Sequence, residues 1–321
     1  MKVAHLITSK IFAGIEQHVF ELAQATGHET NHVILCDKAL SGSFTGIKSH
    51  AMKIGSRRSP VNIIKLAFYL TKNNIDILHC HGAKASSIGI WIGRLTKVKI
   101  VVTIHGHKSH KTSFKHADAI IGVNKKLVQN IPNAAFIPNW FNPNHLGHPS
   151  SRTGPVIAVG RLEKVKGFDL LIKSWVGINA ELNIIGSGQE EHSLAVLIKI
   201  LNLSDRVKIL TGYSYSSIED IYKNASGLIV SSLREGGPRV VLEAINHEIP
   251  VIGTKVGIMP EIIPIECLTE PGDQNSLQAL LEEMVPLLPQ LDVKALKISM
   301  HENFSLSSAA NHTNKIYLSL K

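Results

Sequence analysis

Two glutamates on either side of a glycine-rich turn suit a ligand with two polar ends. Glu235 stands before residues 236–238, Gly-Gly-Pro, and Glu243 follows eight positions after Glu235. An apolar run over residues 227–230 predicts a buried strand before the turn, and apolar residues at three-to-four spacing predict a helix from Pro238 onward. A helical rise separates the two carboxylates by roughly 8–10 Å, about the span from a sugar ring across a diphosphate to a ribose. The helix N-terminus between them offers N–H groups to an anion.

Two cations follow another predicted strand, at residues 156–159. Arg161 and Lys166 lie in the loop after it, and in a parallel sheet this loop shares one edge with Glu235. Arginine presents a planar fork to phosphate oxygens, whereas lysine acts as a mobile point charge. Each cation–anion contact at ~4 Å contributes roughly 4 kcal/mol before desolvation. The pair therefore predicts a group that stabilises a departing diphosphate.

Predicted strands and helices alternate in both halves of the chain, which indicates parallel sheets covered by helices. The predicted strands are residues 2–8, 32–36, 50–54, 75–79, 99–104 and 119–123, then 156–159, 182–185, 207–210, 227–230 and 250–253. The predicted helices are residues 15–25, 61–72 and 84–95, then 168–177, 189–201, 217–225, 276–288 and 305–320. Dense turn formers over residues 138–155 predict a linker. We expect an N-terminal domain (1–148), a C-terminal domain (149–304) and a last segment (305–321) that crosses back to the first domain.

Charged residues are distributed unevenly along the 321 residues of the sequence. Residues 1–150 hold 18 Lys and Arg against 6 Asp and Glu, while residues 151–321 hold 16 against 19. The basic half also carries 13 of the 17 histidines. Such a half favours an anionic partner: an acidic membrane surface or an anionic substrate. Nucleic acid is disfavoured, because aromatic residues for base stacking do not interleave with the cations.

Several other classes of protein are poorly supported. The sequence has no Gly-x-Gly-x-x-Gly after its first strand and no phosphate-binding P-loop, which argues against a nicotinamide dehydrogenase or a P-loop enzyme. It has no Asp-x-Asp, so a carboxylate-held divalent metal is not expected, and the protein's own cations would act on the diphosphate instead. The histidine pairs 79/81 and 105/107 show no evident third ligand, so most are expected in the core or at strand ends.

The cysteines and the first residues point to the cytoplasm. Cys36, Cys80 and Cys267 lie far apart and form no Cys-x-x-Cys, so we expect small buried side chains in a reducing compartment. The first eight residues have the pattern of a strand rather than of a signal peptide. No run of ~18 uninterrupted apolar residues predicts a membrane span. The expected location is cytoplasmic, with peripheral binding to the inner face of the cytoplasmic membrane.

Four motifs in order resemble the nucleotide-sugar domain of family 4 retaining glycosyltransferases, which have the GT-B fold. They are Gly-Arg-Leu-x-x-x-Lys-Gly (160–167), Ile-Ile-Gly-Ser-Gly (184–188), Leu-Thr-Gly-Tyr (210–213) and Glu-x7-Glu (235–243). Their order and spacing match over about residues 155–265. The first half is similar at the loop of residues 14–19 and at the strand end of residues 103–106. The resemblance implies two Rossmann-like domains whose parallel sheets face each other across a cleft.

The resemblance also implies a role for each matching residue. Arg161 and Lys166 would bind the donor diphosphate, and Glu243 would bind the ribose. Glu235 and the amides of Gly236 and Gly237 would hold the donor sugar. The remaining donor residues would be Gly14 near the phosphates and Tyr213 near the base, and the acceptor residues would be Glu16, Lys108 and Lys111. Catalysis would fall to His105, Glu235, Arg161 and Lys166, without a metal or other cofactor. Two departures from the family pattern are Ala13, where a glycine is usual, and residues 256–261.

The expected reaction transfers a hexose-like sugar from a nucleotide diphosphate sugar to a glycan or glycolipid, with retention. Lipopolysaccharide or surface polysaccharide synthesis is the expected setting. Two alternatives stay open: a GT-B sugar-nucleotide epimerase, which needs no acceptor, and a non-catalytic module that binds a nucleotide or nucleic acid. Donor hydrolysis, donor isomerisation or oligonucleotide binding would separate the three.

Overall fold

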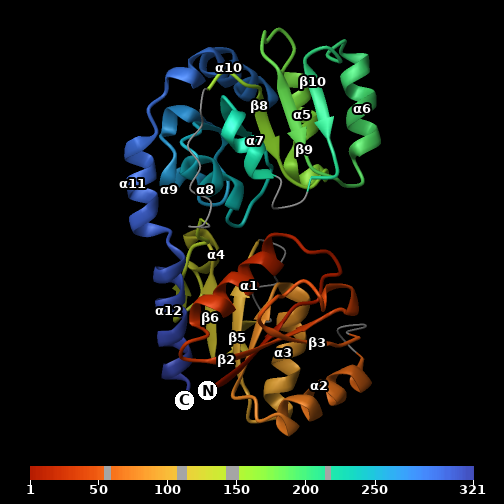
Figure 1. The fold of residues 1–321 in the computed structure, drawn as a ribbon, viewed down its shortest axis with the longest axis vertical. Helices are drawn as coiled ribbons and strands as arrows, with labels where there is room; N and C mark the ends of the chain where they lie inside the picture. The colour runs from red at the N-terminus through yellow and green to blue at the C-terminus, as the bar shows by residue number, and fades with distance from the viewer. Residues whose placement is uncertain (54–58, 107–113, 142–151, 214–217) are drawn as a thin grey trace. The chain divides into compact units, whose positions relative to one another are not determined.

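The protein consists of two compact units, drawn in the computed structural model of Figure 1. The structure describes residues 1–53, 59–106, 114–141, 152–213 and 218–321. One unit comprises Met1–Asn139 with Leu306–Lys321, and the other comprises Trp140–Ser305. The division falls inside the segment 138–155 that the sequence predicts as a linker, and residues 142–151 of that segment lie outside the described part.

The first unit is built on a parallel sheet of seven strands in the order β3-β2-β1-β4-β5-β6-β7. The strands are β1 (Lys2–Leu6), β2 (Asn31–Cys36), β3 (Lys48–Ala51), β4 (Ile77–His81), β5 (Lys99–Ile104), β6 (Ala119–Gly122) and β7 (Ala134–Phe136). Chain order reverses between β1 and β4, so the loops after these two strands diverge. Ligands bind at such switch points in open α/β sheets.

The two faces of this sheet differ in chemistry. One face is apolar: residues such as Leu6, Leu78 and Val102 pack with helices α2 (Pro60–Lys72) and α3 (Ala83–Leu95). The other face carries histidines as well as apolar residues, and residues of α1 (Gly14–Thr26) and α12 (Leu306–Ser319) contact it. These two helices pack against each other although they lie at opposite ends of the sequence (Figure 1). A short helix, α4 (Lys125–Val128), lies between β6 and β7.

The second unit contains a parallel sheet of six strands in the order β10-β9-β8-β11-β12-β13. Its strands are β8 (Val156–Val159), β9 (Leu182–Ile185), β10 (Val207–Leu210), β11 (Gly227–Val230), β12 (Val251–Thr254) and β13 (Leu268–Thr269). Its helices are α5 (Phe168–Ser174), α6 (Glu191–Ile200), α7 (Ile218–Asn224), α8 (Arg239–Asn246), α9 (Met259–Ile262), α10 (Gln274–Met284) and α11 (Lys294–Asn303). Here the switch point lies between β8 and β11, the strands that precede the two motifs with charged side chains.

The predicted α/β class with two parallel sheets is confirmed. The strand predicted at residues 227–230 is β11, while the strand predicted at 75–79 lies two residues later, as β4. The register explains the shift, because Ile77 is the first residue of β4 that pairs with both β1 and β5. The sequence analysis missed the short strands β7 and β13 and the helix α11. Among the described residues, no helix is long and apolar enough to cross a membrane.

Candidate active site

Lys166 and Glu235 form an ion pair between the loops that follow β8 and β11. Nζ of Lys166 lies 2.6 Å from Oε1 of Glu235, and the two side chains are only 18% and 14% exposed. The hydroxyl of Ser232 donates to the same carboxylate oxygen over 2.7 Å. Because β8 and β11 are neighbours at the switch point, residues 69 positions apart meet at the carboxyl edge of the sheet. The structure therefore brings together two of the predicted donor residues.

The backbones of the two loops are also joined. Leu233 N–H donates to the Val165 carbonyl over 2.8 Å, and the Ser231 hydroxyl donates to the Lys166 carbonyl over 2.9 Å. Gly167 has φ +65°, and a Cβ atom there would lie 2.2 Å from the Ser231 carbonyl oxygen. Only glycine fits this close approach without strain. The Lys166 side chain thus leaves a loop whose backbone is fixed against its partner loop.

A third segment, formed by the end of β12 and the loop after it, supports the Glu235–Pro238 turn. The Thr254 hydroxyl donates to the Ser232 carbonyl over 2.7 Å. Gly257 has φ +57°, and a Cβ there would lie 2.7 Å from Pro238 Cδ and 2.9 Å from the Gly236 carbonyl oxygen. The sequence analysis treated residues 256–261 only as a departure from the family pattern. In the structure Gly257 packs directly on the turn that carries Gly236 and Gly237.

Glu243 lies on α8, which begins after Pro238 at its N-cap. Four apolar residues of this helix, Val241, Leu242, Ala244 and Ile245, are fully buried, and Glu243 is half-buried. The phenol of Tyr222 on α7 donates to Oε2 of Glu243 over 3.0 Å. Tyr222 is itself 1% exposed. The sequence analysis missed this tyrosine, since nothing in the chain order pairs α7 with α8.

Arg161 differs from Lys166 although both belong to one loop. Its side chain is 66% exposed and pairs with Glu163 over 2.7 Å. The glycines of the Ile-Ile-Gly-Ser-Gly motif support this loop: a Cβ at Gly186 would lie 1.9 Å from the Gly160 carbonyl oxygen, and one at Gly188 would lie 2.4 Å from the Leu162 carbonyl oxygen. Arg161 thus has a fixed backbone and a side chain largely in solvent.

The last predicted donor residue of this unit, Tyr213, follows the edge strand β10 and is 47% exposed. Strands β9 and β8 separate β10 from β11, so no described contact joins Tyr213 to Glu235 or Glu243. Residues 214–217, which come next, lie outside the described part. The role of Tyr213 at the base stays a prediction.

The first unit holds the remaining predicted residues. Gly14 is the first residue of α1, and a Cβ there would meet nothing within 4 Å. Glu16 is 2% exposed, and its carboxylate accepts from the Ala13 N–H over 2.9 Å and from the Ser9 hydroxyl. Glu16 therefore caps α1, and its role toward an acceptor stays a prediction. Lys108 and Lys111 lie outside the described residues.

His105 follows β5 and is half-buried. Its Nε2 lies 3.3 Å from Nδ1 of His81 on β4. The predicted core position of the strand histidines agrees with the structure, because His5, His79 and His81 are at most 2% exposed. Burial and neighbouring imidazoles lower the pKa of His79 to about 3 and hold the pKa values of His5 and His81 well below the ordinary range.

The structure also shows which residues could act as a third metal ligand beside the predicted histidine pairs. Among the described residues, two groups have nitrogens within 4.8 Å of one another: His5 with His79 and His81, and His18 with His81 and His105. The third histidine is His5 of β1 in the first group and His18 of α1 in the second, and neither was predicted as a ligand from the sequence. Each group could hold a transition metal by donor type. His5, His79 and His81 also have hydrogen-bond partners in the structure, with Nδ1 of His79 2.6 Å from the Tyr317 hydroxyl of α12.

The sequence and the fold match those of glycosyltransferases. The family described as "Glycosyl transferases group 1" matches residues 149–286, and "Glycosyltransferase Family 4" matches residues 12–139. The fold superposes on the crystal structure of Anabaena HepE in complex with UDP-glucose with a TM-score of 0.85, at 17% identity, and covers 99% of this chain and 100% of that one.

Two curated relatives are also similar to the chain over most of its length. The gpi3 subunit of phosphatidylinositol N-acetylglucosaminyltransferase from Schizosaccharomyces pombe is 29% identical, over 96% of this chain and 78% of the relative. N-acetyl-alpha-D-glucosaminyl L-malate synthase from Bacillus anthracis is 22% identical, over 79% and 77%. The architecture is that of a GT-B glycosyltransferase. The chain belongs to the glycosyltransferase group 1 and family 4 proteins, as the sequence motifs suggested.

Proposed function

We propose that this glycosyltransferase moves a sugar from a nucleoside diphosphate sugar to a glycan or glycolipid, with retention of the anomeric configuration. The observation that carries the proposal is the Lys166–Glu235 pair, fixed at the switch point of the second sheet and followed by Glu243 on α8. A cation, a carboxylate and a helix N-terminus together suit a ligand that combines hydroxyl groups with a diphosphate. An epimerase would use the same donor chemistry, so the product decides between them.

The proposed roles combine this geometry with the roles that the family resemblance implies. Lys166 stabilises the charge that develops on the departing diphosphate, and Arg161, with its exposed guanidinium, binds the same group from the rim of the loop. Glu235 accepts hydrogen bonds from the donor sugar. Glu243, held by Tyr222, accepts from the ribose. No metal enters this scheme, because protein cations oppose the leaving-group charge.

The names of the relatives suggest the first donor to test. Both curated relatives named above carry N-acetylglucosaminyl in their names, and the B. anthracis enzyme's name specifies an alpha product. UDP-N-acetylglucosamine is therefore the first probe. The S. pombe protein's name also contains phosphatidylinositol, an anionic lipid, which supports a lipid-linked acceptor. Lipopolysaccharide or surface polysaccharide assembly is the setting that we propose for such an acceptor.

A basic and apolar face on α2 supports docking of the first unit on an anionic membrane. Val61, Ile64 and Phe68 are 58–68% exposed and recur at helical spacing along one side of α2. Lysines at positions 65 and 72 accompany them, and Lys72 Nζ lies 6.0 Å from the centre of the Phe68 ring. Apolar side chains next to cations are the combination that interfacial helices use on anionic lipid.

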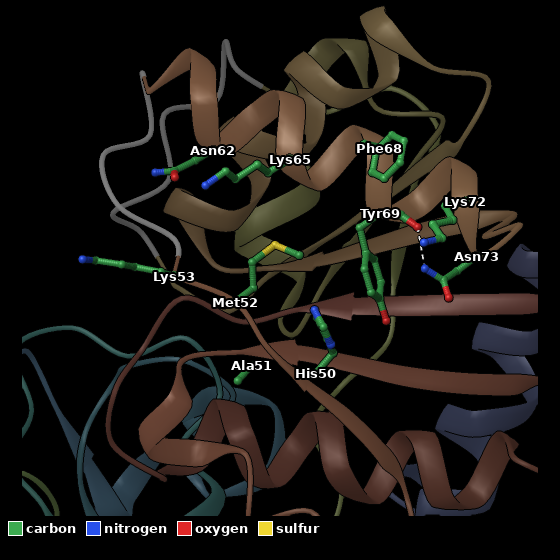
Figure 2. Close-up of a pocket in the computed structure, with 10 residues that line it drawn as sticks. All are labelled: His50, Ala51, Met52, Lys53, Asn62, Lys65, Phe68, Tyr69, Lys72 and Asn73. Carbon is green, nitrogen blue, oxygen red and sulfur yellow. Dashed lines mark hydrogen bonds between the residues drawn. The ribbon is translucent and has the colours of Figure 1, made fainter.

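A pocket beside this face could receive a lipid headgroup. It has a volume of about 550 Å³ between the end of β3 and α2 (Figure 2). The rings of His50 and Tyr69 stack in it with centres 4.4 Å apart, and Lys53, Lys65 and Lys72 lie on its rim. Each cation near an anionic leaflet contributes about 1 kcal/mol.

Donor turnover tests the proposal. Incubation with UDP-N-acetylglucosamine, and then with other nucleotide sugars, should release nucleoside diphosphate slowly and faster with a suitable glycolipid. The product should keep the donor's anomeric configuration by proton NMR, and EDTA should leave the rate unchanged. Conversion of the donor to an isomer without nucleotide release would establish an epimerase instead. Oligonucleotide binding without any turnover would establish a binding module.

Vesicle flotation tests the membrane surface separately. Vesicles with anionic lipid should recruit the protein, and added salt should release it. The variant K65E/K72E should lose most of this recruitment, whereas K208E, at an exposed lysine of the second unit, should behave as wild type. Equal recruitment to neutral vesicles would contradict an electrostatic surface.

A further inference from the structure

Four histidines and one threonine form a continuous hydrogen-bonded chain across the first sheet. Thr26 Oγ1 lies 2.8 Å from His32 Nε2, and His32 Nδ1 lies 2.9 Å from His5 Nε2. His5 Nδ1 lies 3.1 Å from His81 Nε2, and His81 Nδ1 lies 3.3 Å from His105 Nε2. The four imidazoles come in order from β2, β1, β4 and the end of β5, which are adjacent strands. The chain thus crosses the sheet to the edge where His105 lies.

The Thr26 hydroxyl determines which nitrogens donate and which accept along this chain of hydrogen bonds. Its hydroxyl carries one proton, and it donates that proton to the Leu22 carbonyl oxygen over 2.7 Å, because a carbonyl oxygen can only accept. The same hydroxyl must therefore accept from His32. Nε2 of His32 carries the proton, and Nδ1 of His32 is the acceptor. Thr26 is 1% exposed, so water does not compete for these bonds.

The tautomer of each ring then determines the next. A neutral imidazole has one N–H donor and one acceptor nitrogen. Because Nδ1 of His32 accepts, Nε2 of His5 donates and Nδ1 of His5 accepts. By the same rule His81 donates from Nε2 and accepts at Nδ1. His105 finally donates from Nε2 to His81.

Burial keeps three of the four rings, those of His32, His5 and His81, neutral at physiological pH. Burial lowers the pKa of His32 to about 4, and burial with neighbouring imidazoles holds the pKa values of His5 and His81 well below the ordinary 6.5. His79 contacts the chain from the side but bonds to Thr103 and Tyr317, so it forms a separate branch.

We propose that Thr26 is a positioning residue that, through His32, His5 and His81, makes His105 donate from Nε2 to His81 and so fixes the orientation of the His105 ring. The effect of this orientation on sugar transfer rests on the proposed function. The direction of the hydrogen bonds does not, since it follows from the Thr26 hydroxyl and the neutral rings between Thr26 and His105.

Imidazole NMR tests the tautomers in the absence of any substrate. In the ¹⁵N-labelled full-length protein at pH 7.5, protonated and unprotonated ring nitrogens have distinct shifts, and each ring can be assigned. All four rings should carry the proton on Nε2. Thr26→Val keeps the side-chain shape but removes the hydroxyl, so His32 and the rings beyond it should shift toward mixed tautomers. Thr26→Ser keeps the hydroxyl and should give the wild-type spectrum.

Three results would overturn the assignment. They are an Nδ1–H tautomer at any of the four rings in the wild type, unchanged tautomers in Thr26→Val, and a stoichiometric transition metal bound to these rings in the purified protein. A merely structural role for Thr26 would change thermal stability in Thr26→Val without changing the tautomers. Thr26→Val is sufficient as the variant without a hydroxyl, because valine matches the shape of threonine.

Turnover adds a second readout that depends on the proposed function. Losing a directed hydrogen bond at His105 should lower kcat/KM about 2- to 10-fold in Thr26→Val. Thr26→Ser should restore it. If the wild type turns over no nucleotide sugar while the four tautomers are as expected, the proposed function fails and the positioning role of Thr26 stands. Wild-type kcat/KM in Thr26→Val, despite changed tautomers, would show that the orientation of the His105 ring does not affect sugar transfer and would overturn the positioning role of Thr26 in catalysis.

Discussion

Nζ of Lys166 lies 2.6 Å from Oε1 of Glu235, so two residues expected at different parts of a donor ligand hold each other in place. An ammonium has three N–H donors, and this bond uses one of them. The carboxylate also receives the Ser232 hydroxyl. The side chains are therefore oriented by each other and by a neighbour, which reduces the ordering that substrate binding must supply.

Removal of the Lys166 charge should slow sugar transfer strongly. Lys166→Met should lower kcat about 100-fold, because preorganised charge near a leaving group is worth that much in comparable sites. Lys164→Met, at an exposed lysine of the same turn, is the matched control and should keep the wild-type rate. Steady-state kinetics with the donor identified by the screen measures both. A wild-type kcat in Lys166→Met would remove this residue from leaving-group stabilisation.

Glu243 and Tyr222 should act together on nucleotide binding. Glu243→Gln should weaken nucleoside diphosphate binding about 10-fold, since hydrogen bonds to a charged acceptor are stronger than neutral ones. Tyr222→Phe should weaken it less, because the carboxylate stays but loses one donor. Calorimetric titration gives both affinities, with Glu283→Gln on the exposed side of α10 as the control. Equal affinity for the nucleotide in all three variants would contradict ribose binding by Glu243.

Gly257 should matter for the donor loop as well as for stability. Gly257→Ala places a Cβ at φ +57° and within 3 Å of both Pro238 and the Gly236 carbonyl. Gly177→Ala is a matched control, because Gly177 has φ +90° and open space around its Cβ position. Both variants should lose about 1–2 kcal/mol for the left-handed backbone, and only Gly257→Ala should also lose donor affinity. Thermal melts measure the loss of stability, and titrations with the donor show whether Gly257→Ala alone also loses donor affinity.

The sequence predicted the donor loops better than their supports. Glu235 and Lys166 could be placed on one edge because each follows an apolar run of strand length, and parallel strands share that edge. Tyr222, Thr254 and Gly257 could not be found, because their contacts depend on which helices and loops become neighbours across the sheet. Arg161 shows the same limit: its motif predicts a role equal to that of Lys166, but its side chain is 66% exposed and pairs with Glu163.

The hydrogen-bonded chain of histidines could not be predicted without knowing the order of the strands in the sheet. His5 and His79 are 74 positions apart in sequence but pair directly in the register of β1 and β4. Alternation along a strand predicts that His79 and His81 share a face, yet it does not say which strands lie beside β4. The expected return of residues 305–321 to the first domain likewise does not say that α12 covers the face with the histidines. For the same reason the third histidine of each group could not be found from the sequence.

Acid should destabilise the first unit through these histidines. The pKa of His79 is lowered to about 3 and that of His32 to about 4, both by burial first, from an ordinary 6.5. The unfolded chain therefore binds protons near pH 6.5 where the folded chain does not. Stability is fully present above pH 6.5 and falls as the pH drops toward 4, by up to about 1.4 kcal/mol per pH unit for each such residue.

Denaturant unfolding at pH 7.5 and pH 5.0 measures this effect. The wild type should lose a few kcal/mol between the two pH values, and His79→Gln should lose less over the same interval because one of the groups that resist protonation is gone. His192→Gln is the control, since that imidazole is exposed on α6 and its loss should leave the pH dependence unchanged. Identical pH dependence in wild type and His79→Gln would show that His79 is protonated as easily in the folded protein as in the unfolded chain.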